Sequence, residues 1–159
     1  MNATIRAARP GDELRIWELI GELADYEKLP HLVTGTAQAL GEHLFGPTPF
    51  VYAMVAETEG IVGYVLYFTN YSTFRTQPGI WMEDLYVTPS ERGKGIGKAL
   101  LLAVAKQVHE SGWGRHEWAV LDWNQPAIDF YESLGAVVMP DWRVCRVEDN
   151  ALQALAERM

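Results

Sequence analysis

A glycine-rich segment, Arg92-Gly93-Lys94-Gly95-Ile96-Gly97, has the residue types and spacing of a phosphate-binding turn. Glycines let backbone N–H groups approach an anion because no Cβ stands in the way. The segment follows an apolar run, Ile80 to Val87, and precedes a helical run, Lys98 to His109, so it joins a strand to a helix. The helix start adds unpaired N–H groups and the positive end of its dipole. This favours a site for a phosphorylated cofactor over a merely flexible surface loop.

The spacing of the glycines excludes two common phosphate loops. A nucleoside-triphosphate loop requires a glycine five positions before its Gly-Lys pair, and that position is Arg92. The dinucleotide fingerprint G-x-G-x-x-G fails from both possible starts, because Gly93 and Gly95 would place Lys98 and Leu100 where the third glycine belongs. The pattern that remains is Arg-x-x-Gly-x-Gly.

Three side chains near this turn could move protons. Glu83 and Asp84 interrupt the apolar strand before the loop, and Tyr131 lies on a helical segment opened by Asn124. Successive residues of a regular strand point to opposite faces, so we expect the two carboxylates to act at different places. Each also has a structural alternative: an ion pair for a carboxylate and core packing for the tyrosine.

The elements that must position these residues follow from hydrophobic periodicity and turn signals. Asp12 is a candidate N-cap of the first helix. The hairpin strands precede an alternation of strands and helices, which predicts one α/β (α+β) domain over residues 1–159, with a mixed sheet covered by helices. Strands are expected at 4–8, 50–57, 61–69, 80–87, 116–121, 136–139 and 143–147. Helices are expected at 12–29, 36–44, 98–109, 124–134 and after Asp149. Residues 70–79 are expected to form a loop.

Composition limits the classes of partner. The net charge of −8 disfavours nucleic acid and anionic membranes and suits a small cationic substrate. The single cysteine, Cys145, permits no internal disulfide, which fits a reducing compartment such as the cytoplasm. The N-terminus does not resemble a signal peptide, and no apolar run approaches the ~20 residues of a membrane span. The four histidines lack metal-ligand spacing, so no metal site is expected.

The glycine loop and three further segments carry a family resemblance. The segments are Trp81 to Val87, Ala119 to Ala136, and Leu23 to Leu29. Together with the loop, they resemble the GNAT superfamily of N-acetyltransferases. The Val-Leu-Asp-Trp-Asn block with Tyr131 resembles its diamine branch, the spermidine/spermine and thialysine acetyltransferases. The resemblance extends from about residue 4 to residue 147, but the segment after Gly135 lacks the longer acidic stretch of that branch.

The resemblance implies a fold in which the fourth and fifth strands splay apart around the pantetheine arm of acetyl-CoA. It also implies a small cationic amine as acceptor, direct attack in a ternary complex, and a homodimer. Two alternatives remain: acetylation of a protein or peptide amine, and a non-catalytic CoA-binding module.

The same resemblance implies roles for individual residues. Glu83 would accept the proton of the amine, and Tyr131 would protonate the leaving thiolate. Tyr26 and Glu27 would recognise the amine; the alternative for these two residues is that they form a solvated helix end without a role in binding. Implied cofactor-binding residues are Leu85, Tyr86, Val87, Arg92, Gly93, Lys94, Gly95, Ile96, Gly97, Lys98, Asn124, Pro126, Ala127 and Tyr131. Implied substrate-binding residues are Tyr26, Glu27, Glu83, Glu117, Trp118 and Ala119.

Overall fold

The computed structural model describes residues 3–159, which divide into two compact units, with the boundary in the chain after Ala119. The first unit is built on a five-stranded sheet with the strand order β1-β2-β3-β4-β5. The first four strands pair antiparallel, and β5 is parallel to β4, so the predicted mixed sheet is confirmed. The strands are β1 (Thr4–Ala7), β2 (Tyr52–Glu57), β3 (Ile61–Ser72), β4 (Gln77–Val87) and β5 (His116–Trp118).

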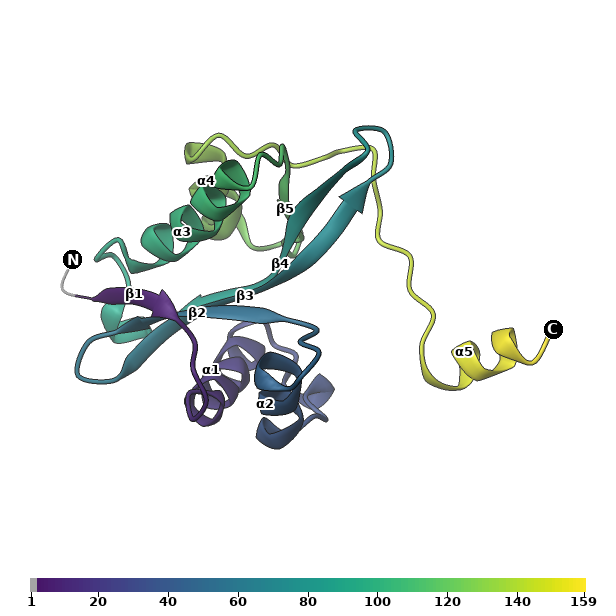
Figure 1. Ribbon diagram of the computed structural model, residues 1–159, viewed down its shortest axis with the longest axis horizontal. Helices are drawn as coiled ribbons and strands as arrows, with labels where there is room; N and C mark the ends of the chain where they lie inside the picture. Colours follow the sequence, from purple (N-terminus) through teal and green to yellow (C-terminus); the bar gives the residue numbers. More distant parts are fainter. Residues whose placement is uncertain (1–2) are drawn as a thin grey trace. The chain divides into compact units, whose positions relative to one another are not determined.

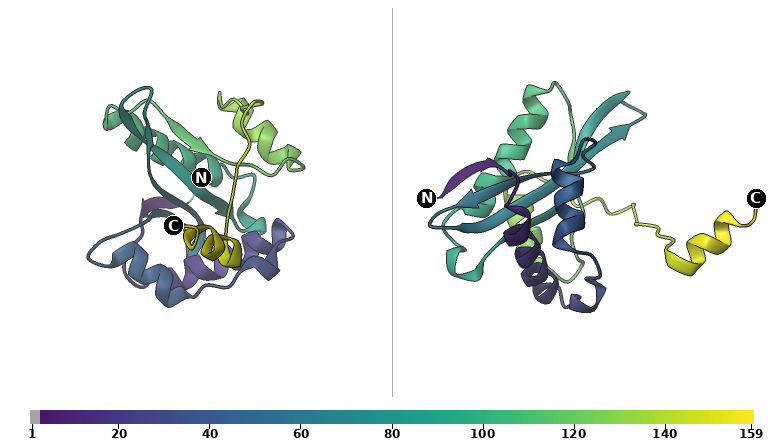
Figure 2. Two further views of the ribbon diagram at one scale, coloured as in Figure 1. Left: turned by 90° about the vertical axis from the view of Figure 1, so that its right-hand side faces the viewer. Right: turned by 60° about the horizontal axis from the view of Figure 1, so that its bottom comes forward.

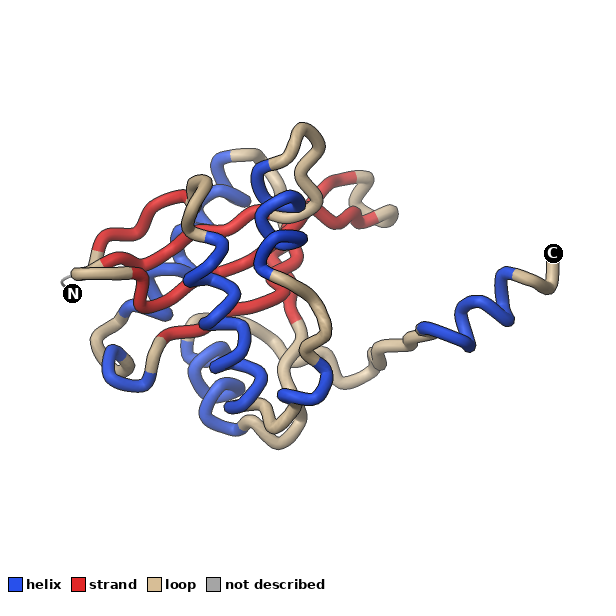
Figure 3. Tube along the Cα trace, turned by 90° about the horizontal axis from the view of Figure 1, so that it is seen from below, coloured by secondary structure: helices blue, strands red, loops and turns tan. Residues whose placement is uncertain are grey.

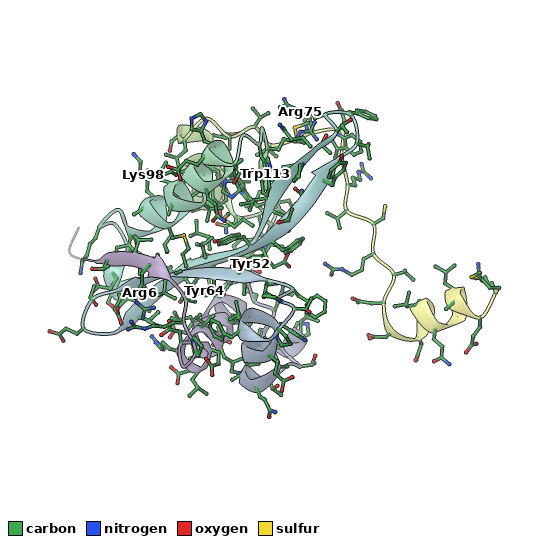
Figure 4. All side chains as sticks on the ribbon, in the orientation of Figure 1. Arg6, Tyr52, Tyr64, Arg75, Lys98 and Trp113 are labelled. Atoms are coloured by element: carbon green, nitrogen blue, oxygen red, sulfur yellow. The ribbon has the colours of Figure 1, made fainter. Side chains whose placement is uncertain are left out.

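Helices cover both faces of this sheet (Figure 1, Figure 3). Helices α1 (Glu13–Tyr26) and α2 (Ala37–Phe45) lie on one face, and α3 (Ile96–Glu110) lies on the other (Figure 2). Short 3-10 turns at Pro30–Leu32 and Pro89–Glu91 complete the unit. The core beneath α1 joins Ile16 and Leu19 to the fully buried Tyr64 of β3, which Figure 4 labels on the α1 side of the sheet.

Arg6 joins the start of α1 to the sheet. Its guanidinium donates to Asp12 over 2.7 Å and to Glu57 over 2.8 Å. Asp12 was expected to cap α1 with its side chain, but no such hydrogen bond forms. Its carboxylate instead accepts from Arg6, which lowers the pKa of Asp12 below its ordinary value.

The hairpin of β3 and β4 is longer than its sequence indicates. The predicted loop at 70–79 is wrong, because pairing continues from Asn70 with Gly79 to Ser72 with Gln77. The turn itself needs only the residues between the two strands, with Thr76 in the left-handed region at φ 50°. Polar residues thus extend the ladder beyond the core, where the partner strand satisfies their backbone groups.

Strands β4 and β5 run together for only three residue pairs, from Ile80 with His116 to Met82 with Trp118. Beyond Met82, β4 continues to Val87 without pairing to any further strand on that side among residues 3–159. This is the separation of the fourth and fifth strands that the fold prediction required. The fifth strand is shorter than the predicted range of 116–121 because it ends at Trp118.

The second unit begins at Val120 and contains α4 (Gln125–Ser133) and α5 (Asp149–Ala156). The strands predicted at 136–139 and 143–147 do not form. A β-strand requires a partner for its backbone groups, and this connecting segment has none among the residues described. Its apolar side chains are exposed, including Val137, Trp142 and Val144, each with more than 70% of its surface accessible.

Candidate active site

A cavity of about 320 Å³ lies between the last turns of α1, the segment after it and β4. Three carboxylates contribute to its wall: Glu27, Glu83 and Asp84. The rest of the wall is apolar and comes from α1 and residues 29–33. The cavity therefore combines negative charge with an aliphatic surface. Its other lining residues are Ile20, Leu23, Ala24, Leu29, Leu32 and Val33.

A β-bulge places the two consecutive carboxylates on one cavity wall. Leu66 pairs with Asp84, but the next residue, Tyr67, pairs with Met82, so Glu83 is the extra residue of β4. A bulge inserts one residue and re-aims the side chains around it. The expectation that regular alternation turns Glu83 and Asp84 to opposite faces is therefore wrong, because the alternation does not hold at this point and both residues line one cavity.

Asp84 is the carboxylate that the sequence interpretation missed as a site residue. It accepts a hydrogen bond from the Tyr64 hydroxyl over 2.9 Å. Burial raises its pKa to about 6, and the nearby Glu83 and Glu27 add to this rise, although the Tyr64 hydrogen bond opposes it. The only sequence signal that could have pointed to Asp84 was its place next to Glu83. The register of β3 against β4 decides which face of the sheet each of the two side chains occupies.

Glu27 and Glu83 complete the acidic wall. Burial raises the pKa of Glu27 above its ordinary value, and the charge of Glu83 contributes to the same shift. Glu83 is the most exposed of the three, and the indole Nε1–H of Trp81 donates to its Oε2 over 3.0 Å. That hydrogen bond orients a solvent-accessible carboxylate at the edge of the cavity.

The glycine loop has the backbone conformation that an anion cradle requires. Gly93 and Gly95 adopt left-handed φ values of 76° and 81°, and Gly95 is the N-cap of α3. A Cβ added at either glycine would meet nothing within 4 Å, so their surroundings are open. The first turn of α3, from Ile96 to Lys98, presents its N–H groups here. These residues fit a pyrophosphate.

Two of the three basic side chains at the loop are held by the protein itself. Lys94 lies 3.0 Å from the carboxylate of Glu91. Arg92 donates from Nε to the carbonyl oxygen of Val87 over 2.8 Å. The guanidinium carbon of Arg92 also lies 5.1 Å from the ring centroids of both Tyr26 and Tyr86. The remaining base of the loop, Lys98, lies on α3 and is exposed (Figure 4).

The predicted substrate residues separate into two groups. Glu27 and Glu83 line the acidic cavity, whereas Tyr26 does not and packs on Arg92 instead. Glu117 of β5 accepts a hydrogen bond from Asn70 over 3.4 Å. Trp118 contacts the ring of His116 at a centroid distance of 4.9 Å, and Ala119 follows β5.

The predicted cofactor residues of the second unit lie at the start of α4 and in its last turn. The Asn124 side chain accepts from the Ala127 N–H over 3.4 Å, so the predicted helix cap is confirmed. Pro126 occupies the first turn, where its missing N–H costs no hydrogen bond. Tyr131 lies on the same helix, with its ring 5.4 Å from that of Phe130.

Residues 3–159 contain no group of three or more His, Cys, Asp or Glu side chains that could hold a metal ion. No helix among them is long and apolar enough to span a membrane.

Residues 15–136 match the Acetyltransferase (GNAT) family, and the chain belongs to that family. It is 41% identical to the thialysine N-epsilon-acetyltransferase of Bos taurus over 96% of each chain. It is 35% identical to the L-ornithine N5-acetyltransferase NATA1 of Arabidopsis thaliana, over 98% of this chain and 88% of the plant protein. Among solved structures, an integron cassette protein of V. cholerae superposes with a TM-score of 0.82 at 26% identity over 99% of both chains. The predicted fold and the prediction of an N-acetyltransferase are confirmed.

Proposed function

We propose that this enzyme transfers the acetyl group of acetyl-CoA to a primary amine of a small aliphatic diamine or a thialysine-like amino acid. The observation that carries the proposal is the cavity of about 320 Å³ with three carboxylates on an otherwise apolar wall. Ammonium groups complement the carboxylates, and a methylene chain complements the apolar surface. The names of the bovine and plant relatives, a thialysine and an ornithine acetyltransferase, support the same substrate class.

The acceptor amine must lose a proton before it can attack, because a free aliphatic amine has a pKa of about 10.4. Glu83 is the proposed proton acceptor, directly or through one water, since it is the accessible carboxylate and is oriented by Trp81. Asp84 and Glu27 hold the positive charge of the substrate. The acetyl group then passes to the amine nitrogen by direct attack within a ternary complex.

The residues that serve the donor come from the strand, the loop and α4. Backbone N–H groups of Leu85 to Val87 lie on the part of β4 beyond its pairing with β5, where they serve the carbonyl oxygen and the pantetheine amides. Gly93 to Lys98 hold the pyrophosphate through backbone N–H groups. Tyr131 protonates the leaving thiolate, because a phenol of pKa about 10 carries its proton at neutral pH. Asn124, Pro126 and Ala127 contribute the start of α4.

An assay of acetyl-CoA consumption with spermidine, putrescine, thialysine, ornithine and lysine tests the proposal. We expect turnover with at least one of these amines. Asp84→Asn should raise the KM for that amine and leave the KM for acetyl-CoA unchanged. CoA binding without turnover of any amine would instead support the non-catalytic module, and preference for a peptide amine in competition would support the protein acetyltransferase.

The exposed apolar segment of the second unit supports a homodimer as the assembled form. Val137, Trp142 and Val144 would be covered by a second copy of the chain, which could also supply the strand partners that residues 136–147 lack. Sedimentation velocity should therefore give a dimer, and Val144→Asp should give a monomer.

We also propose a cytoplasmic location, consistent with a free and exposed Cys145.

A further inference from the structure

The side chain of Arg92 joins three elements at the entrance of the glycine loop. Arg92 directly precedes Gly93, and its Nε donates to the carbonyl oxygen of Val87 at the end of β4 over 2.8 Å. The guanidinium lies between two aromatic rings, Tyr26 at the end of α1 and Tyr86 on β4, with both centroids 5.1 Å from its central carbon. An arginine over a tyrosine face is attracted by the negative face of the ring and by stacking.

The rings on either side are themselves fixed. The Tyr86 hydroxyl donates to Glu22 of α1 over 3.1 Å, and Tyr86 is buried in the core cluster. Glu22 in turn lies 3.5 Å from Arg15 on the same helix. Tyr26 is the last residue of α1, and the residue as a whole is 40% exposed. The arginine is thus clamped between a buried ring and a ring on the helix end.

We infer that Tyr26 is a positioning residue for the glycine loop, acting through Arg92, rather than a contact for the amine. The inference rests on the proposed role of the loop in binding the pyrophosphate. A Cβ added at Gly93 or Gly95 would meet nothing within 4 Å, so the loop is held mainly at its two ends: by Arg92 at its entrance and by α3, whose N-cap is Gly95, at its exit. The clamp orders that entrance before the donor binds, which reduces the conformational entropy lost on binding.

Two adjacent residues of the chain therefore serve different substrates. Glu27 lines the acidic cavity for the acceptor, whereas Tyr26 holds the loop for the donor. A tyrosine in contact with the amine would line that cavity, and Tyr26 is not among its lining residues. The effects of changing Tyr26 should consequently appear in the binding of CoA.

Calorimetry and steady-state kinetics on the full chain test this assignment. Tyr26→Ala should weaken CoA binding about two- to fivefold and leave the KM for the amine unchanged at saturating acetyl-CoA. Tyr26→Phe should restore wild-type affinity because the ring is kept. Tyr71→Ala, at an exposed tyrosine of β3, is the matched control and should change neither quantity. An increase in the KM for the amine with unchanged CoA affinity would overturn the assignment.

Hydrogen exchange of the CoA-free protein gives a reading that does not depend on the proposed function. The amides of Gly93 to Gly95 should exchange faster in Tyr26→Ala and at the wild-type rate in Tyr26→Phe. A double-mutant cycle with Arg92→Lys adds a second test, since the two changes should be non-additive in CoA affinity. Unchanged exchange or strict additivity would show that the clamp does not position the loop. Failure of the wild-type protein to bind CoA would reject the proposed function.

Discussion

The hydroxyl group of Tyr64 lies 2.9 Å from Oδ2 of Asp84 and donates a hydrogen bond to it. Tyr64 is fully buried in the core beneath α1, so the hydrogen bond ties the wall of the acidic cavity to the hydrophobic core of the first unit. Burial nevertheless raises the pKa of Asp84 to about 6, which brings its ionisation close to neutral pH. Several measurable properties depend on this carboxylate.

The affinity for a diamine should increase as the pH rises through about 6. A free aliphatic amine stays protonated below a pH of about 10, so the change reports the ionisation of the protein. We expect binding to tighten about tenfold between pH 5 and pH 8 in calorimetry without acetyl-CoA. Asp84→Asn should reduce this dependence, and Tyr64→Phe should shift its midpoint upward because a hydrogen bond to the charged form is lost. Glu27 lines the same cavity and also has a raised pKa, so the double variant Glu27→Gln, Asp84→Asn should lose the pH dependence of diamine affinity that remains in Asp84→Asn. An unchanged profile in the double variant would contradict the assignment.

Asp84→Asn should also stabilise the enzyme, in a manner that depends on pH. The pKa of Asp84 is raised in the folded state, so the folded form is favoured while the carboxyl is protonated and loses that advantage as pH rises through about 6. Above pH 7 the variant should therefore be more stable by roughly 2 kcal/mol, and below a pH of about 4 the difference should vanish. Thermal unfolding at both pH values measures this. A stabilisation that persists at acid pH would require a cause other than the charge of Asp84.

Glu83→Gln should lower kcat about 10²-fold, because the amide cannot accept the proton of the amine. The side chain is exposed and bonded to Trp81, so neither the melting temperature nor the affinity for CoA should change. Glu59→Gln, in the turn between β2 and β3, is the matched control for loss of one exposed carboxylate. A kcat equal to that of the control would leave Glu83 as a charge that only binds substrate.

Gly97→Ala tests how closely the donor approaches α3. An added Cβ would meet only the Val87 side chain at 3.7 Å, an ordinary contact, and alanine is a better helix former than glycine. The variant should therefore be at least as stable as the wild type and yet bind CoA at least about tenfold more weakly, because a phosphate would meet the methyl group. Gly21→Ala on α1, where a Cβ also has open space, should match its stability without affecting CoA binding. Equal CoA affinity in both variants would place the pyrophosphate elsewhere.

Tyr131→Phe should lower kcat about 10²-fold while CoA binding stays within twofold of wild type, because the aromatic ring is kept and only the hydroxyl group that would donate the proton is removed. Tyr71→Phe is the control for loss of an exposed hydroxyl. Turnover and calorimetric affinity are measured on the same preparations. Unchanged turnover would assign protonation of the thiolate to another group.

The glycine loop and its flanking elements could be predicted because their signals are local. The spacing of Gly93, Gly95 and Gly97 after an apolar strand determines a strand-turn-helix unit without reference to the rest of the chain. The same is true of Asn124, whose cap on α4 needs only residues of that helix. Family resemblance then supplied the chemistry of acetyl transfer.

The features that the sequence did not reveal are contacts between distant segments. The place of Asp84 depends on a register shift against Leu66 and Tyr67, which the sequence of β4 does not contain. The location of Tyr26 beside Arg92 similarly requires α1 to meet the end of β4. Residues 136–147 have strand-forming side chains, but propensity alone supplies no partner for their backbone groups.

The bulge at Glu83 has a consequence for engineering the acceptor specificity of related enzymes. Two neighbouring acids line one cavity here only because the main chain carries an additional residue opposite Leu66 and Tyr67. Grafting Glu-Asp onto a regular strand of another acetyltransferase would turn one acid away from the acceptor. A successful transplant must carry the irregular backbone together with the pair, so a comparison of side chains alone would misjudge which enzymes share this preference.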